Sequence, residues 1–163
     1  MRTRVFPMLV CCCAIACGRG EKSNAGPGTT AAVSPPAPST GGTTAAAPQA
    51  VTGKTWDVKM IGDGTGYRFD PPALTIKVGD GVRWTVVSGL PHNVTFWADS
   101  IPSGANASLQ ANMQQTIGPL TGPLLTNLSQ TYLVSFGGAR PGVYHYYCTP
   151  HLALGMKGSI TVQ

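Results

Sequence analysis

Beyond Gly53 the chain consists of short stretches in which apolar and polar residues alternate or apolar residues run together, separated by Gly, Pro and Asp. This pattern is typical of β-strands joined by turns. Seven strands are predicted, at Thr55–Ile61, Ala73–Val78, Val82–Val87, Asn93–Trp97, Thr131–Phe136, Gly142–Cys148 and Lys157–Val162. So many short strands in about 110 residues favour an all-β fold, a sandwich of two sheets.

Two connections have signals of their own. The run Gly79–Gly81 predicts a hairpin turn between its flanking strands, because glycine tolerates the positive φ of such turns. The segment 98–130 is longer than a turn, and Ser103–Gln115 within it has weak helical spacing in Leu109 and Met113.

The first residues predict export. Two arginines precede Phe6–Ala16, an apolar run too short to span a bilayer, so residues 1–16 are interpreted as a secretory signal peptide. The run Ala14–Cys17 resembles a bacterial lipobox, in which small residues precede a cysteine that is lipidated. We therefore expect the mature protein on the periplasmic or cell-surface side, tethered to a membrane through Cys17. An ordinary signal peptide with small residues before its cleavage site is the alternative.

Residues 17–52 comprise this cysteine and a predicted linker. From Gly18 to Thr52 the chain is almost entirely Ala, Thr, Gly, Pro and Ser and lacks aromatic residues, so it cannot bury a core. A flexible coil of this length has a root-mean-square reach of roughly 30 to 35 Å. The folded domain is thus expected to span residues 53–163.

Charge adds little to this picture. The domain has a small excess of basic over acidic residues: Lys54, Lys59, Arg68, Lys77, Arg83, Arg140 and Lys157 against Asp57, Asp63, Asp70, Asp80 and Asp99. Without a basic run or an aromatic ladder, a nucleic-acid partner is not expected. The excess indicates either mild steering toward an acidic redox partner or simply a solvated face.

The candidate chemistry lies in Tyr144–Met156, which holds Cys148, His151 and Met156 with the spacing Cys-x2-His-x4-Met. A thiolate, an imidazole and a weak thioether are the ligands of copper in a trigonal site with a long axial sulfur bond. Such a site requires a second histidine, and His92 in a strand-like segment far upstream is the candidate. These four residues are the predicted ligands of one copper ion per chain.

Two further observations support the ligand assignment. Cys148 is the only cysteine in the predicted domain, so it has no disulfide partner, and its neighbours favour a ligand over an inert buried thiol. If Cys148 points into the sandwich, strand alternation also turns Tyr144 and Tyr146 inward and turns His145 and Tyr147 outward. This removes His145 from the site.

The stretches Phe69–Asp80, Pro91–Val94 and Tyr144–Val162 together resemble the plastocyanin branch of the cupredoxins, and the likeness covers most of Thr55–Gln163. The resemblance implies a Greek-key β-sandwich with a type 1 (blue) copper centre held by the four residues named above. It also implies that an apolar patch at Leu152–Leu154 surrounds the exposed edge of His151 and receives redox partners. The position of Tyr147 is that of a second, more remote electron port in this family.

The surroundings of the metal suggest two interactions. Asn93 follows a ligand and is expected to hydrogen-bond to the ligand loop, pinning the two segments together. Pro150 has no N–H, so it cannot donate to the thiolate, which is expected to lower the reduction potential relative to a site with a second donor.

The predicted function is that of an exported type 1 copper protein, a monomer that carries single electrons between protein partners by Cu(I)/Cu(II) cycling. The alternative is a protein that stores copper or delivers it to a cuproenzyme. An enzyme is disfavoured, because four ligands fill the site and the chain shows no nucleophile–base set. A binuclear centre is disfavoured because it needs a second cysteine beside Cys148.

Overall fold

The structure, a computed structural model, describes residues 46–163. The predicted signal peptide, the lipidated Cys17 and most of the predicted linker lie outside the described residues. The elements are β1 (Thr55–Asp63), β2 (Gly66–Asp70), β3 (Ala73–Ile76), β4 (Gly81–Val86), β5 (Thr95–Phe96), α1 (Asn106–Asn112), β6 (Thr131–Ser135), β7 (Gly142–Tyr147), the 3₁₀ helix η1 (Thr149–Leu154) and β8 (Lys157–Val162). Within the described residues, no helix is both long enough and apolar enough to cross a bilayer.

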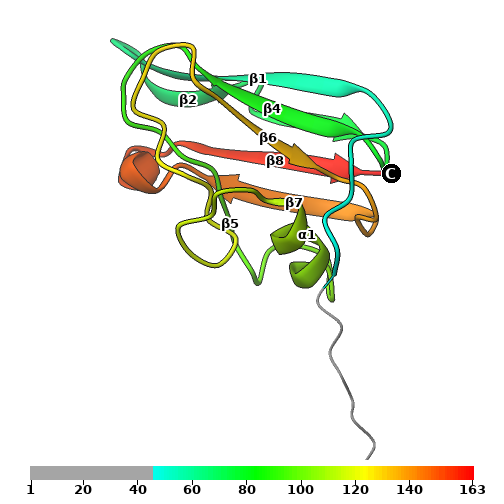
Figure 1. The fold of residues 1–163 in the computed structure, drawn as a ribbon. Coiled ribbons are helices and arrows are strands. Elements are labelled where there is room, and N and C mark those ends of the chain that lie inside the picture. Colours follow the sequence, from blue (N-terminus) through cyan, green and yellow to red (C-terminus); the bar gives the residue numbers. More distant parts are fainter. Residues whose placement is uncertain (1–45) are drawn as a thin grey trace, which may run out of the picture. The chain divides into compact units, whose positions relative to one another are not determined.

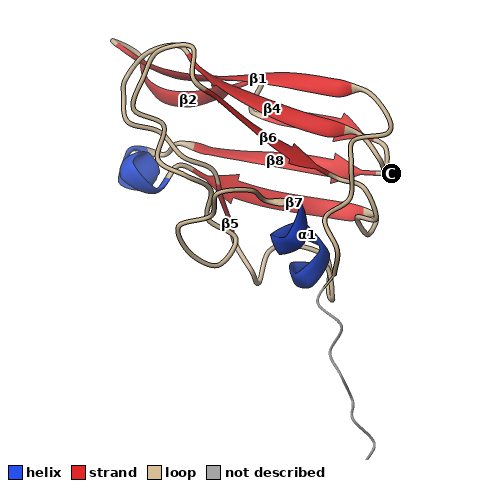
Figure 2. Cartoon of the chain, viewed as in Figure 1, coloured by secondary structure: helices blue, strands red, loops and turns tan. Residues whose placement is uncertain are grey.

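The strands form two four-stranded sheets that face each other (Figure 1), with the orders β2-β1-β4-β6 and β3-β8-β7-β5. Each sheet is mixed, because β1 runs parallel to β4 and β3 runs parallel to β8, whereas the other pairs are antiparallel. Figure 2 shows that strands dominate the structure and that both helices lie outside the sheets. The expected two-sheet β-sandwich is confirmed.

The core fills the space between the sheets and is rich in large aromatic side chains. Strand alternation on β7 has the expected outcome: Tyr144, Tyr146 and Cys148 are fully buried, and His145 is exposed. Trp84 from the opposite sheet packs edge-on against Tyr146, with ring centroids 5.3 Å apart. This core fixes the end of β7, from which the cysteine projects.

Two connections differ from the sequence prediction. The sequence does not predict β2, whose five residues are too few for a clear alternation; β2 pairs with β1 as an antiparallel hairpin. The predicted hairpin at Gly79–Gly81 is wrong, because β3 and β4 belong to different sheets and this turn carries the chain between them. Asp80 stabilises the crossing: its carboxylate accepts hydrogen bonds from the backbone of Lys54 (2.8 Å) and Lys77 (3.0 Å) and from the indole of Trp56 (2.9 Å).

The long segment between β5 and β6 contains the short helix that its spacing indicates. Asn112 ends α1, and its side-chain amide donates to the carbonyls of Ser135 (3.0 Å) and Gly137 (2.9 Å), which ties the helix to β6. The Asn112 side-chain oxygen accepts the N–H of Gln49 at 2.7 Å, and the N–H of Thr52 donates to Gly79 at 2.9 Å. The last residues of the expected linker are therefore bound to the folded unit.

Candidate metal centre

Three buried side chains from distant parts of the chain meet at one end of the sandwich. The Nδ1 atoms of His92 and His151 lie 3.6 Å and 3.4 Å from the sulfur of Cys148, and the three potential ligand atoms are all within 4.8 Å of one another. His92 and Cys148 are fully buried, and His151 is 6% exposed. The structure thus brings together three of the four predicted ligands.

The fourth predicted ligand, Met156, closes the loop around the sulfur. It is fully buried, its N–H donates to the carbonyl of His151 (3.2 Å), and its carbonyl accepts from the N–H of Cys148 (3.1 Å). The chain reverses at Gly155, whose φ of +85° suits a residue without a side chain. The short 3₁₀ helix between the two residues therefore brings the backbone of Met156 back beside that of Cys148.

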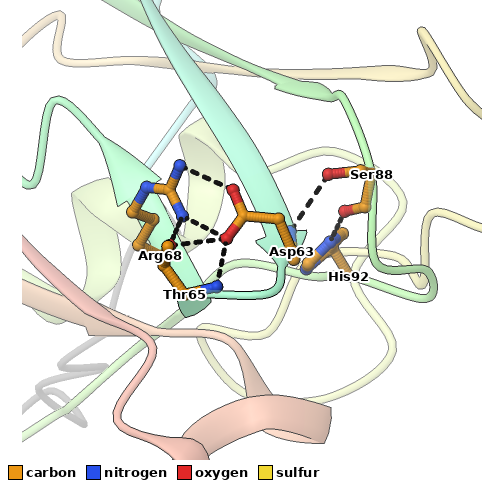
Figure 3. A network of polar contacts seen from close by, with 6 residues as sticks. Asp63, Thr65, Arg68, Ser88 and His92 are labelled. Carbon is orange, nitrogen blue, oxygen red and sulfur yellow. Dashed lines mark hydrogen bonds and ion pairs between the residues drawn. The ribbon is translucent and has the colours of Figure 1, made fainter.

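The ring of His92 is oriented by the loop that follows β4. Its Nε2 donates to the carbonyl of Ser88 at 2.7 Å, so the proton is on Nε2 and the lone pair of Nδ1 faces the sulfur. The N–H of Gly62 in β1 donates to the same carbonyl at 3.0 Å. Figure 3 shows Ser88 between this strand and His92, beside the ion pair of Arg68 with Asp63.

The ring of His151 is held by an aromatic partner that the sequence did not indicate. Tyr67 of β2 stacks on it, with ring centroids 3.8 Å apart and an interplanar angle of 17°. Burial lowers the pKa of His151, and the neighbouring His92 lowers it further. Burial also lowers the pKa of His92, against the opposing effect of its bond to Ser88. Both imidazoles therefore favour the neutral form that binds metal.

The sulfur itself is a buried thiol in the metal-free protein. Burial raises the pKa of Cys148, and the backbone N–H of Asn93, 3.5 Å from the sulfur, opposes that rise. A bound cation reverses this balance, because a coordinated thiol loses its proton. Without a cation the sulfur therefore favours the neutral thiol, and it would bind a cation as the thiolate.

The expected link between the His92 segment and the ligand loop is present. The side chain of Asn93 accepts the N–H of Thr149 at 2.7 Å and donates to the hydroxyl of Thr149 at 3.1 Å. The hydroxyl of Thr95 lies 2.9 Å from the same oxygen. These bonds join Asn93 and the first residue of β5 to Thr149, the first residue after the cysteine, and so hold the His92 segment against the ligand loop.

This donor set fits copper. The cluster offers one sulfur and two imidazole nitrogens that are buried and face one another, and a buried thioether lies in the same loop. Such a soft, trigonal ligand set selects copper over harder cations. His145 is exposed, and Met60 and Met113 are buried in the core, so none of these joins the cluster.

Residues 56–163 match the family of copper binding proteins described as the plastocyanin/azurin family. The chain belongs to this family. The resemblance to plastocyanin-like cupredoxins and the expected copper cofactor are thereby confirmed. Because proteins of this family carry electrons and are not enzymes, the expectation of a non-enzymatic protein is confirmed as well.

Individual members of the family are similar over the same region. The chain is 39% identical to plastocyanin of Scenedesmus fuscus over 106 residues, which cover 65% of this chain and 97% of that protein. It is 41% identical to plastocyanin of a Synechococcus strain over 109 residues, or 67% of this chain and 74% of that protein. Oxidized plastocyanin of Dryopteris crassirhizoma has a similar structure, with a TM-score of 0.50 and 29% identity over 66% of this chain and all of that one.

Proposed function

We propose that this member of the plastocyanin/azurin family binds one copper ion through His92, Cys148, His151 and Met156 and carries single electrons between protein partners outside the cytoplasm. The observation that carries the proposal is the convergence of two Nδ1 atoms and one sulfur within 4.8 Å, in a buried cluster. Copper held by such ligands accepts and releases one electron.

The protein's own contribution is to keep the ligands still. Ser88 fixes the tautomer of His92, Tyr67 holds the ring of His151, and Asn93 pins the ligand loop. Ligands that are fixed in one arrangement before and after electron transfer reorganise little, and burial keeps water out of the site. Both properties suit a carrier that must exchange electrons quickly.

Partners are proposed to dock at the copper end, over an apolar patch. Leu154 is 61% exposed and Ala153 is exposed beside it, in the loop that holds His151. Leu124 is 43% exposed and precedes Leu125, which forms a β-bridge with His92. Leu90 is 38% exposed and precedes Pro91, the residue before His92. Exposed leucines around a buried ligand are typical of a docking surface that excludes water when a partner binds.

Copper storage or delivery receives no support from this geometry. Delivery requires ligands that a receiving protein can reach, whereas Cys148 and Met156 are fully buried and Asn93 bridges the loop that would have to open. The same features favour retention of the ion through many redox cycles.

The test is a copper titration of the purified domain, followed by absorption spectroscopy and voltammetry. We expect one equivalent of Cu(II) to give an intense visible band from the thiolate and a reversible one-electron wave. Cys148→Ser should abolish the band and His151→Ala should weaken copper binding, whereas the exposed His145→Ala should change neither. A protein that remains colourless with stoichiometric copper would refute the proposal.

The tether is a separate part of the proposal. Lipidation of Cys17 should direct the full-length protein to the membrane fraction of a bacterial host, and Cys17→Ala should release it into the soluble extracytoplasmic fraction. A wild-type protein that fractionates entirely as soluble material would remove the anchor without affecting the copper centre.

A further inference from the structure

Three exposed basic side chains gather at the end of the sandwich opposite the ligand loop. Lys54 immediately precedes β1, Lys77 immediately follows β3, and Arg140 lies in the turn before β7. We propose that this basic pole, formed by Lys54, Lys77 and Arg140, binds the phosphate headgroups of an anionic lipid bilayer and so turns the copper end of the tethered protein away from the membrane. This inference rests on the proposed lipid tether.

Strand pairing places the three residues at the same end of the molecule. The start of β1 pairs with the start of β4, and the turn between β3 and β4 brings the end of β3 to the same place. Ile76, the last residue of β3, pairs with Val162 at the end of β8, and Val162 also pairs with Gly142 at the start of β7. The ligand loop follows the other end of β7, and η1 accordingly lies at the far end of the sheets (Figure 1).

The charge of this pole is not compensated by carboxylates of the folded unit. Within residues 46–163 the ion pairs are those of Arg68 with Asp63 and of Arg83 with Asp57, so no side chain of the basic pole takes part in one. Asp80 lies at this pole but is only 6% exposed, and its carboxylate already accepts hydrogen bonds from two backbone N–H groups and an indole. The positive charge is therefore available to an anion from outside.

A hollow between the two lysines is large enough for a lipid headgroup. Its volume of about 310 Å³ is at the lower end of the range for small-molecule sites. The ammonium of Lys54 lies 3.6 Å from the centroid of the Trp56 ring, and this contact holds the charge at the rim. Val78, 45% exposed, follows Lys77 in the turn. Indole, ammonium and apolar side chains together suit the interface between headgroups and acyl chains. The hollow is lined by Lys54, Trp56, Thr75, Ile76, Lys77, Asp80 and Gln163.

The segment that leads to the predicted anchor joins the sandwich at the basic pole. The N–H groups of Thr52 and Gly53 both donate to the carbonyl of Gly79 at 2.9 Å, and Lys54 is the next residue. A bilayer that holds the lipid of Cys17 is thus connected to the domain at this pole and not at the ligand loop. Because the attraction of anionic lipids for Lys and Arg falls off within a Debye length, the charges beside the connection are the ones that act.

Vesicle binding of the mature chain, residues 17–163 with Cys17→Ala, tests the basic pole without the lipid. We expect binding to vesicles of phosphatidylcholine and phosphatidylglycerol in equal parts, and none to phosphatidylcholine alone. Each basic side chain near an anionic bilayer contributes about fivefold to the partition coefficient, so Lys54→Gln combined with Lys77→Gln should lower it about 25-fold. The ionic strength is set at about 0.1 M, where the Debye length is about 10 Å.

The matched control combines Lys59→Gln with Lys157→Gln. These lysines are also exposed, but one lies within β1 and the other begins β8 at the copper end, so the net charge changes equally while the basic pole stays intact. The partition coefficient should change less than about twofold. Orientation is measured by NMR of the metal-free protein with a gadolinium chelate on a lipid headgroup. The amide signals of Val78 and Gly79 should broaden first, and that of Leu154 last.

Equal losses in the two double variants would show a general attraction of positive charge and would overturn the proposal. Equal binding to the two kinds of vesicle, or broadening that begins around Leu154, would do the same. A wild-type protein that carries no lipid at Cys17 removes the tether and this inference with it. If the protein is lipidated but its basic pole shows no preference for anionic vesicles, this inference alone fails. The copper titration is independent of both results.

Discussion

Removal of the Asn93 side chain should separate the contribution of the preformed loop from that of the metal. In Asn93→Ala, Thr149 loses the acceptor of its N–H at 2.7 Å and the amide donor to its hydroxyl at 3.1 Å, while the hydroxyl keeps its contact with Thr95. Two hydrogen bonds at about 1 kcal/mol each, with an additional cost for the N–H left unpaired, give a loss of about 2 to 3 kcal/mol in the free energy of unfolding. The backbone N–H of Asn93 still reaches the sulfur in this variant.

The assay is urea unfolding of the apoprotein and of the copper form, with copper release to a chelator measured alongside. Asn127→Ala is the matched control, because Asn127 is exposed and its amide makes only a 3.5 Å contact; its loss should stay within about 0.5 kcal/mol. Asn93→Asp retains an acceptor for Thr149 without the donor and should give an intermediate loss. Equal stabilities and equal copper release in Asn93→Ala and Asn127→Ala would refute the idea that this side chain holds the loop.

Three further predictions concern stability and can be checked by unfolding of the apoprotein. The N–H of Lys77 and the indole of Trp56 donate to the Asp80 carboxylate and hold its pKa below the ordinary value. The carboxylate therefore stabilises the fold above about pH 4, and this stabilisation is lost as the pH falls through the folded-state pKa. Asp80→Asn should lower the free energy of unfolding by about 2 kcal/mol at neutral pH, and the stabilities of the two proteins should converge in acid. Gly89→Ala should lower the free energy of unfolding by roughly 3 kcal/mol, because the φ of Gly89 is +77° and the added methyl would clash with the backbone of β1. At Gly64 the methyl would meet open space, so Gly64→Ala should lower the free energy of unfolding by about 1 kcal/mol at most. Tyr67→Leu removes the ring stacked on His151 and should cost about 1 kcal/mol, whereas Tyr67→Phe should be nearly neutral; equal values for the two would show that the stack contributes nothing.

The sequence predicted the ligand loop well, because the loop is local. The spacing of Cys148, His151 and Met156 carries the chemistry, and alternation along one strand places the neighbouring side chains correctly. The seven predicted strands all exist, although the one at Asn93–Trp97 is reduced to Thr95–Phe96. Its first residue, Asn93, hydrogen-bonds to the ligand loop, and Val94 accepts the N–H of Gly122 instead of pairing with β7.

What the sequence could not supply is pairing between distant segments. Nothing near Gly79–Gly81 reveals that its two strands join different sheets, since that choice depends on the partners β8 and β6 much later in the chain. The same holds for Tyr67, which meets His151 only after β2 has paired with β1. Two aromatic residues, Tyr67 and Phe69, are visible in Gly66–Asp70, but no local pattern shows which of them stacks on a ligand and which packs in the core.

The described residues before β1, 46–54, form an N-terminal arm, and its position on the sandwich determines how the protein can be attached to an electrode. Thr52 and Gly53 are bound to Gly79, in the turn that precedes β4. The six residues of β4 then carry the chain roughly 20 Å, at about 3.3 Å per residue, before it turns toward His92. In Figure 1 the arm and η1 accordingly lie at opposite ends of the sheets. A gold surface attached through the arm would face the end of the molecule opposite the predicted copper ligands of η1. The tunnelling current should therefore be far weaker than when the same domain is attached through the new thiol of Leu154→Cys.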